Sequence, residues 1–152
     1  MDEFSVADNY LDTGKPEKAV PIFLKLAKQG MVAAMHSYAH CHLYGIGVAK
    51  NYDIAFHWFS QAASRGCPQA MYHLGLCNAE GYGTSKNPEL ALEWYKKSSA
   101  KGDSDSEYRV GLCYERGFGV QADSGKAVEW YRQAEAHGQE DARERLRELV
   151  RT

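Results

Sequence analysis

The chain has little net charge, no long apolar run and no closely paired cysteines. Its 18 Lys and Arg nearly balance its 20 Asp and Glu, so a formal charge of -2 does not favour a DNA or RNA partner. No apolar stretch approaches the ~20 residues of a membrane span. The acidic start MDEFSVADNYLDTGK also lacks the apolar core of a signal peptide. We therefore expect a cytoplasmic protein that binds neither nucleic acid nor membrane.

The four cysteines do not form a local metal or disulfide motif. No C-x-x-C pair is present, which argues against a zinc site. Cys41, Cys77 and Cys113 are spaced by 36 residues. Neighbouring packed helices lie about 8–10 Å apart, whereas a disulfide needs Cα atoms within about 7 Å. We expect these three to be buried free thiols, with Cys67 more exposed beside Pro68.

Catalytic motifs are also missing. There is no G-x-S-x-G elbow, and no serine stands with a histidine and an acid at a known spacing. The Gly81-Tyr82-Gly83 turn lacks both the third glycine of G-x-G-x-x-G and the Lys-Ser/Thr ending of a P-loop. The sequence therefore predicts no enzyme and no cofactor.

The chain does contain a repeat of 36 residues without a gap, over 31–66, 67–102 and 103–138. Each unit reads as two helices joined by Gly-x-Gly, because its apolar positions follow helical spacing. The positions in register are Gly45, Gly81 and Gly117; Gly47, Gly83 and Gly119; Ala55, Ala91 and Ala127; and Trp58, Trp94 and Trp130. A two-helix unit cannot bury both of its faces, so stacked units predict an α-solenoid.

Three local expectations follow from the repeat. Asn51, Asn87 and Asp123 are N-cap residues of the second helices. Gly75 is expected to let the two helices approach closely, with Ala91 facing it. The middle residue of each Gly-x-Gly turn is expected to pack against the next repeat.

The pattern A-x-x-x-L-G-x-C-x-x-x-G-x-G, followed by A-x-x-W-Y, resembles the Sel-one-like repeat family, a relative of the tetratricopeptide repeat. This resemblance implies an all-α fold, a right-handed α-α superhelix, forming a single repeat domain over 1–152. Residues 4–30 resemble a shorter tetratricopeptide-like unit that lacks the Gly-x-Gly loop. Residues 139–152 are expected to supply a C-terminal capping helix.

The resemblance implies a bacterial adaptor or scaffold that binds a protein or peptide partner in its groove. One alternative is a dedicated chaperone or immunity-type protein that neutralises one cognate partner. Another is a β-lactamase-like hydrolase, as described for some relatives with a disulfide in every repeat. This chain differs from those relatives because it has one cysteine per repeat.

The tetratricopeptide resemblance also implies which side chains face the concave groove, namely those one turn apart on each first helix. As a set they do not follow the repeat consensus, which is expected of residues that are freed from packing. Aromatic and Arg side chains often dominate binding energy. The nine predicted groove residues are His36, His40, Tyr44, Tyr72, Leu76, Glu80, Tyr108, Leu112 and Arg116.

His36 and His40 are four residues apart and share a helix face. An H-x-x-x-H pair can ligate a metal, but HSYAH lacks the Glu of H-E-x-x-H and no third ligand is evident. The preferred interpretation is a polar groove surface without metal. If these histidines titrate near their usual pKa, binding is expected to depend on pH between about 5 and 8.

Overall fold

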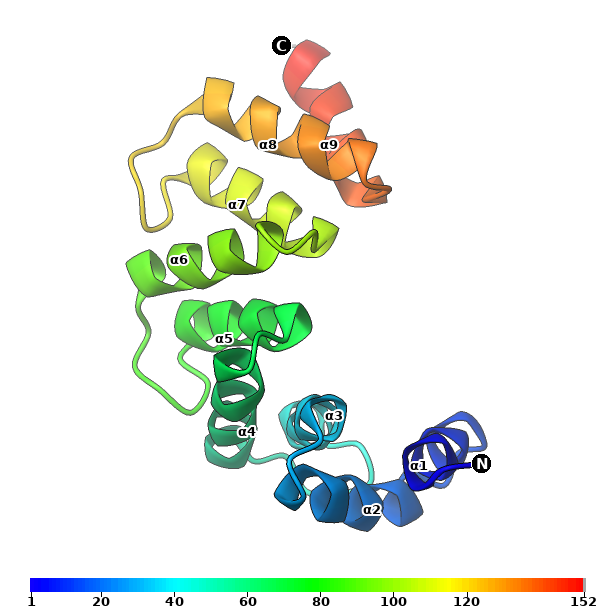
Figure 1. Cartoon of the computed structure of the whole chain (residues 1–152). Coiled ribbons are helices and arrows are strands. Elements are labelled where there is room, and N and C mark those ends of the chain that lie inside the picture. The colour runs from blue at the N-terminus through cyan, green and yellow to red at the C-terminus, as the bar shows by residue number, and fades with distance from the viewer. Residues whose placement is uncertain (152) are drawn as a thin grey trace.

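The structure is a computed structural model that describes residues 1–151; Thr152, the last residue of the expected capping segment, lies outside them. The described residues form a curved array of helices without a strand (Figure 1). This confirms the predicted all-α solenoid. The helices are α1 (Glu3–Asp12), α2 (Pro16–Lys28), α3 (Val32–Tyr44), α4 (Tyr52–Ser64), α5 (Pro68–Glu80), α6 (Pro88–Ser99), α7 (Ser104–Arg116), α8 (Ser124–Ala136) and α9 (Glu140–Arg151).

The main contacts link each helix to the next one in the chain, as expected of a solenoid. Helices α1, α3, α5 and α7 are the first helices of successive pairs, and α2, α4, α6 and α8 are the second helices. In Figure 1, α1 and α3 lie on the inner side of the curve relative to α2 and α4. Side chains on the first helices are therefore placed to line a concave surface.

The second helices of the three full repeats begin as predicted. The side chains of Asn51, Asn87 and Asp123 accept hydrogen bonds from the backbone N–H three residues later, at 3.0–3.1 Å. Their own N–H groups donate to the carbonyls of His42, Asn78 and Tyr114 near the ends of the preceding helices. Each loop is thus closed by the same pair of interactions, which keeps the repeats in equivalent positions.

The second glycine of each Gly-x-Gly turn marks a close approach between repeats. Gly83 has φ +70°, and a Cβ there would overlap the carbonyl oxygen of Tyr52 at the start of α4. Gly47 and Gly119 have similar φ values and lie against the starts of α2 and α6. The turn therefore seats each repeat on the second helix of the preceding one.

The middle residue of the turn packs in the same direction. The Tyr82 ring stacks on Tyr52, with centroids 4.3 Å apart and an angle of 18°. Phe118 likewise lines a hollow together with Ala79 and Tyr95 of the preceding repeat. The expectation that the middle residue contacts the next repeat was wrong. The turn folds back towards the second helix of the preceding repeat, which the second glycine of the turn also contacts.

Gly75 admits an aromatic ring. A Cβ on Gly75 would lie 2.5 Å from Cε1 of Tyr95, so the close neighbour is Tyr95 rather than the expected Ala91. Gly111 and Tyr131 repeat the arrangement in the next unit. Both tyrosines are almost completely buried. The absent Cβ thus creates the space that a large core side chain fills.

The cysteines of the described chain are free, and Cys41, Cys77 and Cys113 are buried as predicted. Burial raises the pKa of the Cys77 thiol to about 12, and raises those of Cys41 and Cys113 to about 11. These thiols therefore stay protonated and act as small apolar side chains. Cys67 is only partly buried, at the N-cap of α5.

The two ends differ from the central repeats. Helices α1 and α2 are joined by a short turn through Gly14, without a Gly-x-Gly loop. At the other end, α9 packs on α8 and buries Ala142 and Leu146. Within residues 1–151, no helix has the combined length and hydrophobicity required to cross a bilayer.

Candidate partner-binding groove

The nine predicted groove residues lie on α3, α5 and α7, and their exposure varies widely. Tyr44 is 48% exposed, whereas Leu112 is only 9% exposed. Glu80 and Arg116 are exposed, and the other five are half-buried. Most of these side chains therefore offer surface to a partner, while Leu112 contributes mainly to packing.

Several hollows in residues 1–151 are lined by first helices. One, of about 480 Å³, lies where α1 and α3 meet the start of α5 and includes His36. Another, of about 380 Å³, lies between α1 and α3 and includes His36 and His40. The hollow between α5 and α7, of about 200 Å³, includes Glu80, Leu112 and Arg116 and is smaller than the roughly 300–1,000 Å³ of typical small-molecule sites. Its size suits a single side chain of a larger ligand.

Between α3 and α5 the corresponding space is filled by a histidine cluster, formed by His36, His40 and His73. Ring centroids within the cluster lie 5.1–6.0 Å apart. His73 stacks flat on Phe59, with centroids 4.6 Å apart and an angle of 3°. Tyr44 covers the cluster, with its ring 4.6 Å from that of His40. The cluster is therefore a packed aromatic surface.

Burial keeps these histidines neutral. It lowers the pKa of His36 to about 4 and that of His73 to about 3, and it also lowers the pKa of His40. The lowered pKa values of His36 and His73 lie below the usual histidine range, so these two side chains do not support the expected dependence of binding on pH between 5 and 8; burial shifts the pKa of His40 in the same direction. Burial, which the sequence reasoning did not include, is the reason.

His73 was missed as a groove residue. Its Nδ1 lies 2.8 Å from the Gln69 carbonyl oxygen and 3.3 Å from Nε2 of His36. Although three histidines meet here, no group of three or more His, Cys, Asp or Glu side chains in residues 1–151 is arranged to hold a metal ion. The Gln69 contact occupies the Nδ1 atom that faces His36.

Arg109 was also missed, one position after Tyr108. Its Nε donates to the Tyr72 hydroxyl at 3.3 Å, and its guanidinium lies 5.8 Å from the centre of the Tyr72 ring. Arg109 is half-buried and lines the hollow between α5 and α7. It adds a cation to a part of the groove for which the sequence indicated Arg116 alone.

The two missed contacts share a spacing. His36 with His73, and Tyr72 with Arg109, are each 37 residues apart. At these two places, side chains of adjacent first helices meet at the repeat length plus one, not at equivalent positions. This offset is the signal from which both residues could have been found.

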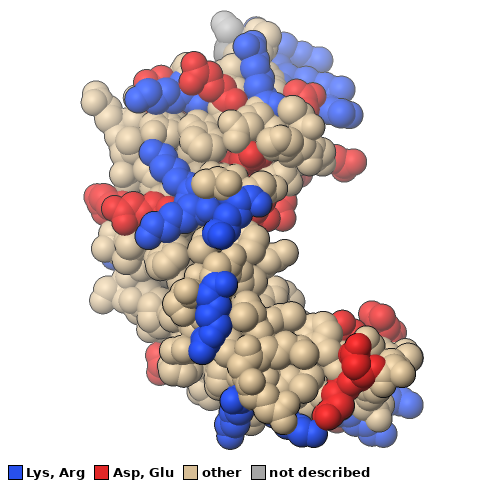
Figure 2. All heavy atoms as spheres, viewed as in Figure 1, with Lys and Arg blue, Asp and Glu red and all other residues tan. Residues whose placement is uncertain are grey.

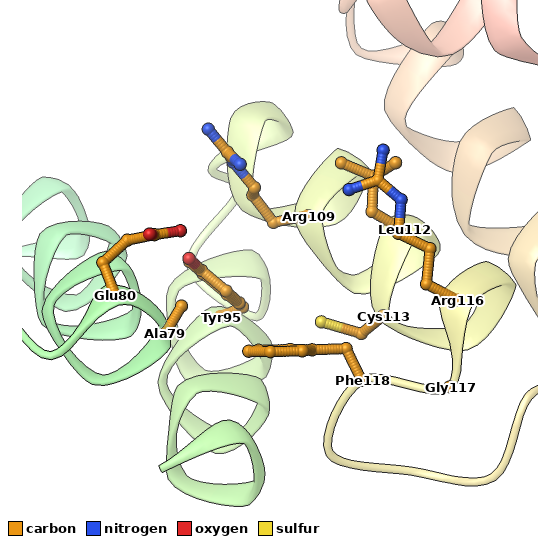
Figure 3. Close-up of a pocket in the computed structure, with 9 residues that line it drawn as sticks. All are labelled: Ala79, Glu80, Tyr95, Arg109, Leu112, Cys113, Arg116, Gly117 and Phe118. Atoms are coloured by element: carbon orange, nitrogen blue, oxygen red, sulfur yellow. The ribbon is translucent and has the colours of Figure 1, made fainter. Parts of the chain in front are cut away.

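Charge is distributed unevenly along the array. On the face seen in Figure 2, Lys and Arg side chains gather around α7, whereas much of the surface over α4 and α5 is uncharged. In Figure 3, Arg109, Leu112 and Arg116 project from α7, and Glu80 reaches towards them from α5. The groove thus has a neutral aromatic part at α3 and α5 and a charged part at α7.

Comparison with known proteins identifies the repeat. The family model of the Sel1 repeat matches residues 32–67, 68–103 and 104–139, one residue later than the units assigned from the sequence. A comparison with curated proteins found no match.

Several solved structures share the architecture. A Sel1 repeat protein from Oxalobacter formigenes is 30% identical with a TM-score of 0.86, and the match covers 96% of this chain and 58% of that one. A protective antigen of uropathogenic Escherichia coli with an SLR fold is 26% identical with a TM-score of 0.89, over 97% of this chain and 32% of that one. Cysteine rich protein B of Helicobacter pylori shares the fold at 23% identity and a TM-score of 0.65, over 85% of this chain and 93% of that one. This chain therefore spans about a third to three fifths of the first two proteins.

Proposed function

The chain belongs to the Sel1 repeat family, and we propose that it is a bacterial adaptor or scaffold that binds a protein or peptide partner in the groove of its first helices. One observation carries the proposal. The alanines that recur in register, Ala55, Ala91 and Ala127, are fully buried, whereas Tyr44, Tyr72, Tyr108 and Arg116 keep exposed surface on successive first helices. Aromatic and Arg side chains on a concave solenoid face are suited to anchor a partner.

An extended or helical segment fits this surface better than a metabolite. The hollow between α5 and α7 has room for one side chain, and the array continues on both sides of it. A polypeptide can place successive side chains along the groove and bury more surface than a small molecule can. The proposed role is non-catalytic.

The proposal extends to domain organisation and location. We propose that residues 1–152 act as one repeat domain, because the main contacts run from each helix to the next throughout residues 3–151. The proposed location is the cytoplasm, since the cysteines are free thiols, the state that a reducing compartment maintains.

Partner capture tests the groove. We expect Tyr44→Ala and Tyr72→Ala each to reduce the capture of proteins that bind the wild-type chain by at least about tenfold, as for anchors worth about 1.4 kcal/mol or more. Glu129→Ala and Arg132→Ala, on the exposed surface of α8, are the controls and should leave capture unchanged. Several captured partners would indicate an adaptor, and one tight partner would indicate a dedicated neutraliser. Capture that is insensitive to both tyrosine variants would place binding outside the groove.

A further inference from the structure

The hollow between α5 and α7 contains charges that have no opposite charge in contact. Among residues 1–151, the ion pairs within 4.0 Å involve neither Arg109, Arg116 nor Glu80. Arg109 is half-buried, and its hydrogen-bond partner is the neutral Tyr72 hydroxyl. A partly desolvated guanidinium without a carboxylate is a favourable position for an external anion.

The two arginines share one side of the hollow. Arg109, Leu112 and Arg116 follow i, i+3 and i+7 spacing, which places them along one face of α7. Ala79, Cys113 and Phe118 supply an apolar lining beneath the charged rim. A ligand group that fits this site combines an anionic end with an aliphatic stem.

We propose that this hollow binds the carboxylate of a Glu or Asp side chain within an extended segment of the partner, with Arg109 and Arg116 as donors. The inference rests on the proposed function of the groove and specifies the chemistry of one anchor. A guanidinium can donate two parallel hydrogen bonds to a carboxylate, which makes the contact both strong and directional. The apolar lining then accommodates the side chain's methylene groups.

Glu80 offsets part of the positive charge of the hollow. Two arginines and one glutamate give the hollow a formal charge of about +1, which one carboxylate balances and which disfavours a lysine. A phosphorylated side chain brings about -1.5 to -2 and is attracted to the same arginines, so the experiment includes a phosphoserine pool to distinguish the two anions.

Binding of blocked peptide pools tests the inference. The pools are acetylated and amidated 12-residue peptides, random at all positions except the sixth, which is Glu, Gln, Lys or phosphoserine. We expect immobilised wild-type protein to retain the Glu pool roughly tenfold more than the Gln pool, as charge-assisted hydrogen bonds imply. Arg109→Gln should remove this preference. Glu80→Gln should raise retention of the Glu pool severalfold, because it removes a repulsive charge.

Controls separate this site from the groove as a whole. Arg132→Gln makes the same charge change as Arg109→Gln but on exposed α8, and should preserve the Glu preference. Glu80 is exposed, so Glu80→Gln tests the site even if Arg109→Gln weakens folding.

The acidic anchor would be overturned by equal retention of the Glu and Gln pools, by stronger retention of the phosphoserine pool, or by no retention of any pool. A further Gln pool, left with a free C-terminal carboxylate, tests whether a chain terminus occupies the site. Retention of that pool equal to that of the Glu pool would also overturn the acidic anchor. If the Glu and Gln pools bind equally and Tyr44→Ala releases both, the groove function stands and the acidic preference fails. If no pool binds, neither proposal is supported.

Discussion

Two glycines in one turn allow two contributions to the free energy of unfolding to be measured separately, that of the contact between repeats and that of the left-handed backbone conformation. Gly81 and Gly83 have similar left-handed φ values, +79° and +70°. A Cβ on Gly81 would meet its nearest atom at an ordinary 3.5 Å, whereas a Cβ on Gly83 would overlap the Tyr52 carbonyl and lie 2.8 Å from Phe56 Cβ. An alanine at either site has the same conformational strain, but only at Gly83 does it push two repeats apart.

The expected magnitudes follow from this difference. The left-handed conformation costs an alanine about 1–2 kcal/mol, so Gly81→Ala should lower the free energy of unfolding by that amount. Gly83→Ala adds an overpacking term of roughly 1–3 kcal/mol, because the neighbouring atoms are backbone and a β-carbon in helix α4. Urea denaturation followed by circular dichroism measures both variants against the wild type. Equal destabilisation of the two variants would refute the idea that the second glycine seats one repeat on another.

Two further predictions concern buried polar groups. The pKa of His73 is lowered to about 3 in the folded chain, so the unfolded chain binds more protons below about pH 6.5 and stability should fall on acidification. His73→Phe keeps the stack on Phe59 and removes the titrating group. In unfolding experiments, the variant should therefore lose about 2 kcal/mol less of its free energy of unfolding between pH 6.5 and 4.5 than the wild type does. A pH profile unchanged from that of the wild type would contradict the burial of His73. Glu107 is 1% exposed and pairs with His137 at 2.8 Å and Gln133 at 2.8 Å, so His137→Ala should destabilise by about 1–3 kcal/mol. Adding Glu107→Gln to His137→Ala should restore part of the lost free energy of unfolding, because the side chain at position 107 is then neutral. If the double variant is less stable than His137→Ala alone, His137 does not compensate a buried charge on Glu107.

The helical architecture was predictable because it depends on positions that recur. Asn51, Asn87 and Asp123 cap their helices through local hydrogen bonds, which sequence spacing is sufficient to indicate. Contacts between units were harder to predict. The sequence places Gly75 in register with Gly111, but whether a methyl group or a ring fills the resulting space depends on the rotation of α6, and the structure places Tyr95 there.

The groove was predictable only in outline. The predicted groove residues are equivalent positions on the first helices, spaced by 36 residues. The contact between Tyr72 and Arg109 spans 37 residues, so the prediction included Tyr72 but not Arg109. Burial was the second omission, because the low pKa of His36 arises from desolvation by neighbouring helices and then from His40.

The positions that escaped prediction carry a different residue in each full repeat. Ser37, His73 and Arg109 occupy the same place in three consecutive first helices. His73 packs against Phe59 and fills the space between α3 and α5. Arg109 instead turns to Tyr72 and leaves a hollow between α5 and α7. The side chain at this position therefore distinguishes the two junctions between full repeats: a neutral ring occupies the α3–α5 junction, whereas a charged hollow remains at the α5–α7 junction. A partner that places a carboxylate at Arg109 must therefore lie along the groove in one register, because no other junction between the full repeats offers that charge.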